Sequence, residues 1–137
     1  MNDSIVERVQ EAIHTTLGGR KIDPVGCIDA LNELVGQGGA IRCNFASERS
    51  LHVECGGQCC EVVLDAARAK LRMLCARLGT LCNQSAGSPV SLYGGEGTVS
   101  SAGRPGQPLA VCFKNTASDH EFTIAFAEPG APGNGSG

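Results

Sequence analysis

The sequence has few aromatic residues and little charge. Its 137 residues include no tryptophan, one tyrosine and four phenylalanines, and only 18% of them are charged, with a formal net charge of −3. Proteins that bind single-stranded nucleic acid usually stack the bases on aromatic side chains, and nucleic-acid-binding domains are usually basic. The composition therefore argues against nucleic acid as a partner.

Two kinds of hydrophobic segment are also missing. No apolar run reaches about 18 residues, the length that a membrane-spanning helix needs. The N-terminal stretch MNDSIVERVQ lacks the basic start and apolar centre of a secretory signal peptide. We therefore expect a cytoplasmic protein without a membrane partner, in which the eight cysteines are reduced thiols rather than a disulfide framework.

No motif of a known reaction stands out either. The chain lacks the spaced glycines of nucleotide-binding loops and the nucleophile elbow of hydrolases. The histidines His14, His52 and His120 are scattered, and Asp119 and His120 would point to opposite faces of a strand. We expect a protein that is not an enzyme, that uses no cofactor and that has no small-molecule substrate.

The length indicates one domain. We expect residues 1–127 to form a single α+β domain and the Pro/Gly/Ser-rich residues 128–137 to form a disordered tail. A capping box at Ser4 predicts an amphipathic helix that ends at Gly18. Asp23, followed by proline, predicts a second helix that ends among the glycines of residues 36–39. Residues 1–36 are thus a predicted helical hairpin.

Strand signals fill most of the remaining chain. Apolar and polar residues alternate in several short segments that turn residues separate: residues 40–45, 50–55, 109–114 and 120–127. A weaker pair, 90–93 and 98–101, is expected to be joined by a turn at 94–97. Consecutive strands with short turns favour an antiparallel sheet. The predicted fold class is α+β, with an antiparallel sheet packed on a long central helix, so that residues 40–127 form a hairpin–helix–sheet core.

The stretch from Cys59 to Leu78, CCEVVLDAARAKLRMLCARL, is expected to be that long helix, because it contains no glycine or proline and many good helix formers. At helical spacing it shows two apolar stripes. The main stripe is expected to face the sheet. The second stripe is mostly small and lies on the opposite side: Val62, Ala66, Ala69, Met73 and Ala76.

The second stripe motivates the main functional hypothesis. A surface helix needs only one apolar stripe, so the second is covered either by the N-terminal hairpin or by another chain. An uncovered stripe would be an interface. We therefore expect a small protein–protein interaction or adaptor domain, whose partner is another protein or, in a homodimer, a second copy.

A cysteine cluster supports an alternative hypothesis, a thiol-based metal-binding or redox-responsive protein. Cys55 ends a predicted strand, and Cys59 and Cys60 would open the long helix, where the helix dipole favours thiolates. The C-x₃-C-C spacing differs from the paired C-x₂-C of zinc ribbons. Cys59, on the polar edge, is expected to be the most reactive thiol. Most other cysteines occupy apolar positions and are expected to be core residues.

Overall fold

The two N-terminal helices begin where the sequence predicts. The computed structural model describes residues 4–85, 91, 93–99 and 108–126. Helix α1 (Ile5–Leu17) begins with the predicted capping box, in which Ser4 and Glu7 exchange side-chain to backbone hydrogen bonds. Helix α2 (Pro24–Gly38) begins at Asp23, whose carboxylate accepts a hydrogen bond from the Gly26 amide at 2.9 Å. The two helices pack against each other, which is consistent with the predicted helical hairpin.

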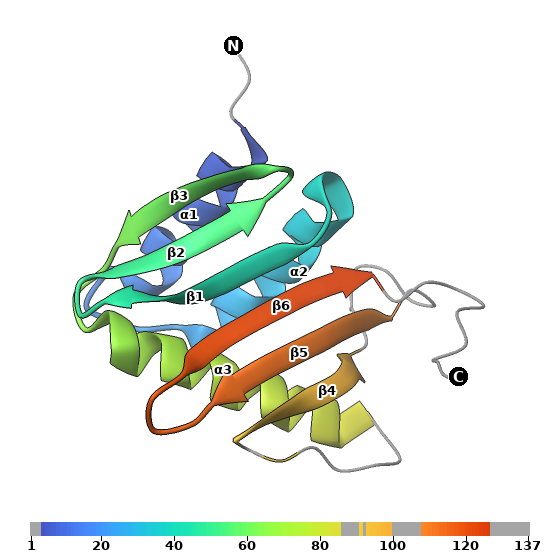
Figure 1. The fold of residues 1–137 in the computed structure, drawn as a ribbon. Helices are drawn as coiled ribbons and strands as arrows, with labels where there is room; N and C mark the ends of the chain where they lie inside the picture. Colours follow the sequence, from blue (N-terminus) through green and yellow to red (C-terminus); the bar gives the residue numbers. More distant parts are fainter. Residues whose placement is uncertain (1–3, 86–90, 92, 100–107, 127–137) are drawn as a thin grey trace.

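The strands form one antiparallel sheet with the order β3-β2-β1-β6-β5-β4 (Figure 1). Its strands are β1 (Ile41–Ser47), β2 (Ser50–Cys55), β3 (Gln58–Val63), β4 (Gly94–Val99), β5 (Leu109–Asn115) and β6 (His120–Phe126). Two hairpins of the sheet meet where β1 pairs with β6, with Ile41 opposite Ile124 and Cys43 opposite Phe122. The strands predicted at 40–45, 50–55, 109–114 and 120–127 are confirmed.

The predicted helix from Cys59 to Leu78 is wrong in its first part. Residues 58–63 form β3, which pairs with β2, and helix α3 extends instead over Ala67–Ser85. Gly56 and Gly57 make the two-residue turn between these strands, with φ values of 64° and 79°. Tight β-hairpin turns that need positive φ at both central residues strongly favour such glycine pairs. The turn, together with β-branched Val62 and Val63, favours a strand here.

A second correction concerns β4. The predicted turn at 94–97 is the first part of this strand, which pairs along its length with β5. Most of the predicted strand at 90–93 and the end of the one at 98–101 lie outside the described residues, as does the predicted tail at 128–137.

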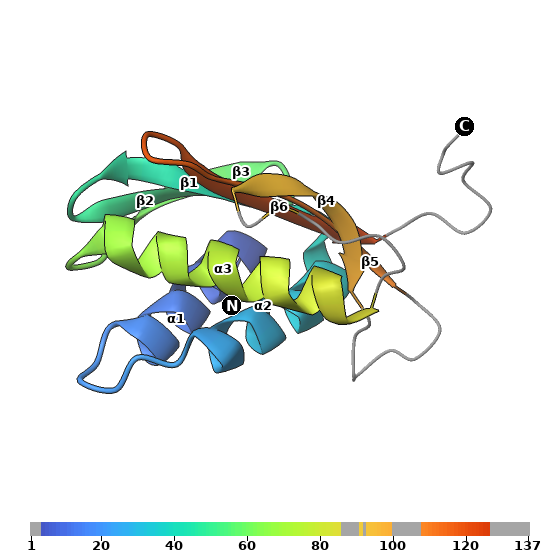
Figure 2. The same cartoon turned by 90° about the horizontal axis from the view of Figure 1, so that it is seen from below.

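The three helices of the described residues cover the same face of the sheet (Figures 1 and 2). Helix α2 contacts both α1 and α3; α1 packs on β2 and β3, and α3 packs mainly on β4, β5 and β6. The inward-facing strand residues meet the apolar sides of the helices in one buried core. The α+β class and the antiparallel sheet are therefore confirmed. None of the described helices combines the length and hydrophobicity needed to span a membrane.

Candidate interaction surfaces

The structure divides the predicted interface between two elements. Val62 lies on β3 and is fully buried, in a strand that α1 contacts. Ala66 directly precedes α3, and Ala69, Met73 and Ala76 lie on this helix; all four are exposed. Val62 therefore belongs to the core, whereas Ala69, Met73 and Ala76 share the solvent-facing side of α3. Ala66 is exposed immediately before the helix, with a φ of 53°.

The side of α3 that faces the sheet explains this exposure. Its buried residues recur at helical spacing, and most have no exposed surface: Ala67, Leu71, Leu74, Cys75, Leu78 and Cys82. At 100° per residue, Ala69, Met73 and Ala76 lie opposite this buried face. Met73 remains 41% exposed, and Thr80 continues the same uncharged surface toward the C-terminus of the helix. We call Ala66, Ala69, Met73 and Ala76 the α3 outer stripe.

Basic residues flank the α3 outer stripe. Helix α3 contains Arg68, Lys70, Arg72 and Arg77 and no acidic residue. Arg68 forms an ion pair with Glu48 at 3.1 Å, and Lys70 is buried. Arg72 is exposed beside the stripe, and Arg77 is half-buried on its other side. The exposed surface of α3 therefore combines small apolar side chains with positive charge.

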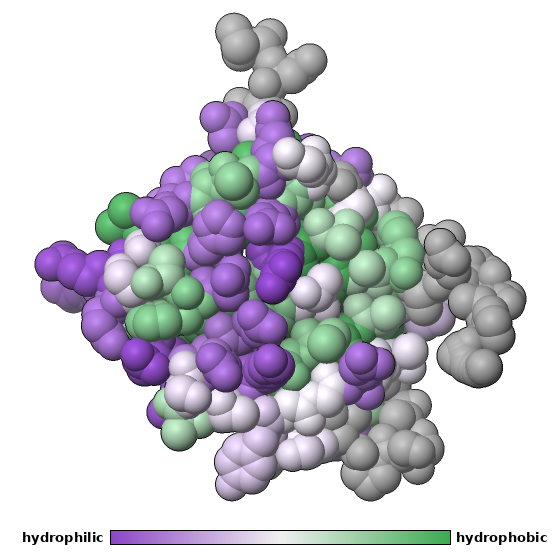
Figure 3. Space-filling view, in the orientation of Figure 1, coloured by the Kyte–Doolittle hydropathy of each residue, from purple (hydrophilic) through white to green (hydrophobic). Residues whose placement is uncertain are grey.

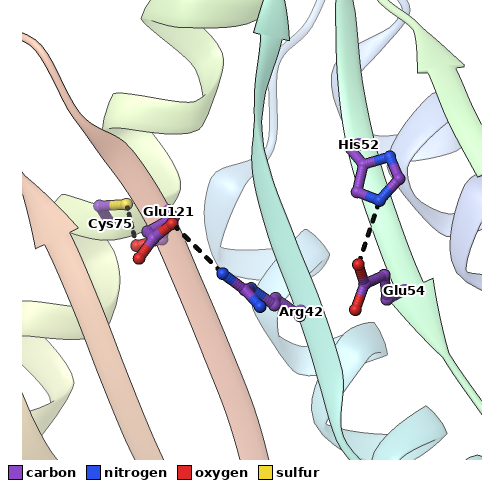
Figure 4. Close-up of polar contacts among 5 residues, drawn as sticks. All are labelled: Arg42, His52, Glu54, Cys75 and Glu121. Atoms are coloured by element: carbon purple, nitrogen blue, oxygen red, sulfur yellow. Dashed lines mark hydrogen bonds and ion pairs between the residues drawn. The ribbon is translucent and has the colours of Figure 1, made fainter. Parts of the chain in front are cut away.

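The face of the sheet that the helices leave uncovered is mixed, with hydrophilic residues in a central band and hydrophobic residues beside it (Figure 3). Arg42 on β1 pairs with Glu121 on β6 at 3.8 Å, and His52 lies 3.2 Å from Glu54 on β2 (Figure 4). Alternation of buried and polar residues is typical of an antiparallel sheet with one solvated face. The polar pairs on β1, β2 and β6 fit this arrangement.

The three cysteines predicted as metal ligands lie on both faces of the sheet. Cys55 is buried and Cys60 is half-buried on the helix-covered side, whereas Cys59 is exposed on the other. Cys59 and Cys60 are strand residues, so the proposed helix dipole does not act on them. Burial raises the pKa of the Cys55 and Cys60 thiols. Within the described residues, no group of three or more His, Cys, Asp or Glu side chains is placed to hold a metal ion.

A polar cluster around His120 was missed at the sequence level. His120 is only 2% exposed, with its Nδ1 3.2 Å from Asn115 Oδ1 and its Nε2 3.3 Å from Arg68 Nη1. The Arg68 guanidinium also lies over the Phe45 ring, 4.3 Å from its centroid. Burial, followed by the charges of Arg68 and Arg72, lowers the pKa of His120. The alternation that directs Phe122 inward also places His120 inward, so this burial could have been predicted.

Comparisons with known proteins assign no family to the chain. No protein-family model matches the sequence, and the search of curated proteins also finds no match.

Proposed function

We propose that this chain is a small, non-enzymatic protein–protein interaction domain that binds a partner through the α3 outer stripe. One observation carries the proposal: an apolar, uncharged strip on α3, the longest of the described helices, is exposed. Helix α2 packs against α3 without covering this outer side, and α1 packs instead on α2, β2 and β3. Contiguous exposed apolar surface on a folded domain marks interaction sites more often than isolated apolar residues do.

The chemistry of the stripe indicates which partner fits. Small side chains such as Ala69 and Ala76 allow a second helix to approach closely, and Met73 supplies a flexible apolar contact. The charged residues of α3 are all basic. A second copy of α3 would bring Arg72 and Arg77 near other basic residues. An amphipathic helix with acidic residues beside a narrow apolar face complements the stripe better.

Photo-crosslinking at Met73 tests this proposal. The chain contains two methionines, and Met73 is the only one beyond the first residue. Photo-methionine incorporated in living cells therefore places a short-range crosslinker in the middle of the α3 outer stripe. We expect a discrete covalent adduct with one protein, which mass spectrometry identifies and maps to Met73, and which Met73→Leu abolishes.

Two further variants make the test specific. Ala69→Glu keeps the crosslinker but introduces a negative charge within the stripe, and we expect it to remove the adduct. Thr15→Glu changes an exposed residue of α1 and should leave the adduct unchanged. If no adduct forms at Met73, or if the adduct persists in Ala69→Glu, the stripe is not the binding surface.

A further inference from the structure

Strand β3 leaves one side of its backbone open at the edge of the sheet. Among the described strands, it pairs only with β2. Four of its six residues are exposed: Gln58, Cys59, Glu61 and Val63. An exposed edge strand offers its free amide and carbonyl groups to another strand, and proteins commonly protect such edges with lysine, proline or bulges. Strand β3 has none of these, and Glu61 is its single charged residue.

The hydrogen bonds at the end of β3 show which groups are free. The backbone amide of Leu64 donates to the Arg49 carbonyl at 2.9 Å, so this amide points toward the β2 side of the strand. Backbone groups alternate in direction along a strand. Cys60 and Val62 therefore bond to β2, whereas Cys59, Glu61 and Val63 direct their amides and carbonyls toward the open edge. The Val63 carbonyl lies 2.8 Å from His14 Nε2 of α1, so it already has a partner.

We propose that β3 pairs antiparallel with β3 of a second copy, with the two-fold axis at Cys60, so that one sheet continues through both copies. In this register, Cys59 of each copy lies opposite Glu61 of the other. Each of these two pairs exchanges two backbone hydrogen bonds through groups that are free in the single chain. The symmetric contact is isologous, as in most dimers of identical chains.

Neighbouring registers are less favourable. The nearest antiparallel registers that keep both inner faces on one side have their axis at Cys59 or at Glu61. With the axis at Glu61, the two Glu61 carboxylates face each other. Cys59 then lies opposite Val63 of the other copy, and this pair needs the Val63 carbonyl, which already bonds to His14. With the axis at Cys59, Glu61 lies opposite Gly57, which belongs to the turn and has a φ of 79°. The register centred on Cys60 avoids all three conflicts.

This register places the two Cys60 thiols together on the inner face. The Cys60 residues of the two copies lie opposite each other in a pair that shares no backbone hydrogen bonds. In such a pair the two Cα atoms are about 4.5 Å apart. That separation lies within the range of disulfides. An added low-molecular-weight disulfide should therefore oxidise the pair: the two thiols lose two hydrogens, one sulfur–sulfur bond forms, and the reagent is reduced to two thiols.

The first test uses the full chain and oxidised glutathione at mildly alkaline pH. We expect a covalent dimer on a non-reducing gel, with peptide mapping showing a Cys60–Cys60 bond. Cys60→Ser should abolish this dimer, and the matched Cys59→Ser should retain it. A covalent dimer that forms through Cys59 or Cys112 instead would overturn the register.

The second test measures non-covalent association under reducing conditions by sedimentation velocity over a range of concentrations. Cys59→Glu places two carboxylates opposite each other and should weaken the dimer several-fold. Cys59→Lys places opposite charges together and should strengthen it several-fold. Glu61→Pro removes an amide that faces the open edge, so it should abolish the dimer and preserve the circular dichroism spectrum.

Association that is equal in the Cys59→Glu and Cys59→Lys variants, or a wild-type chain that stays monomeric at every concentration, would overturn the proposal. This inference is independent of the α3 outer stripe, because β3 and α3 expose different surfaces. Ala69→Glu should therefore leave the dimer intact, and Glu61→Pro should leave the Met73 adduct intact, so the failure of one proposal is distinguishable from the failure of the other.

Discussion

The His120 cluster links the pH of the solution to the stability of the fold. A neutral imidazole can donate from Nδ1 to Asn115 and accept at Nε2 from Arg68, whereas a protonated ring cannot accept from the guanidinium. Burial and the charges of Arg68 and Arg72 oppose protonation, and Asp119 favours it less strongly.

The expected pH dependence follows from this lowered pKa. Above the ordinary histidine value of 6.5, His120 is neutral in both the folded and unfolded states. Below it, the unfolded chain binds a proton that the folded chain resists, so the free energy of unfolding should fall until the pH reaches the folded pKa. Thermal unfolding between pH 8 and pH 4 should show this loss in the wild type and a smaller loss in His120→Phe. An identical pH dependence in both proteins would contradict this role for His120.

Thiol reactivity should follow the burial of each cysteine. Cys59 and Cys112 are the exposed cysteines, but burial, followed by the charges of Glu96 and Glu121, raises the pKa of Cys112. Burial raises the pKa of Cys27 to about 11 and that of Cys75 to about 12. Iodoacetamide should therefore label Cys59 first in dilute native protein, then Cys112, and the buried cysteines only after denaturant is added. Mass spectrometry over time measures this order, and native labelling of Cys75 at the rate of Cys59 would contradict it.

At the scale of elements, local sequence signals predicted where α1 and α2 begin but did not predict β3. The helix caps at Ser4 and Asp23 are local signals, and both helices begin there. The pattern of residues 59–63 fits either a helix or a strand, and their pairing with β2 makes them a strand. The Gly56–Gly57 pair between two short apolar runs was the available signal for a hairpin.

The two sides of α3 should differ in their effect on stability. Leu71 has no exposed surface, so Leu71→Ala should lower the free energy of unfolding by about 2–5 kcal/mol through lost burial and an unfilled cavity. Met73 on the outer stripe is 41% exposed, and Met73→Ala should cost on the order of 0.5 kcal/mol. Urea unfolding of both variants measures the difference. Equal losses would show that the outer stripe is part of the core.

At the scale of the whole molecule, the sequence predicted the class but not the strand order. The pairing of β1 with β6 joins the two halves of the sheet, and these strands are about eighty residues apart in the chain. No local sequence pattern specifies that contact. The same limit applies to the predicted interface. Helical spacing correctly grouped Ala69, Met73 and Ala76, but Val62 joined them only because the strand before α3 was read as helix. The tertiary arrangement of the helices then determined which face stays exposed.

The two proposed contact surfaces are separate, with β3 binding a second copy and the α3 outer stripe binding a different protein. Native mass spectrometry of the gently purified assembly tests this description most directly, because it counts the chains. For the wild type we predict a complex that contains two copies of this 14.1 kDa chain together with the protein crosslinked at Met73. For Ala69→Glu we predict the two copies alone. A single unassociated chain in both samples would contradict the account.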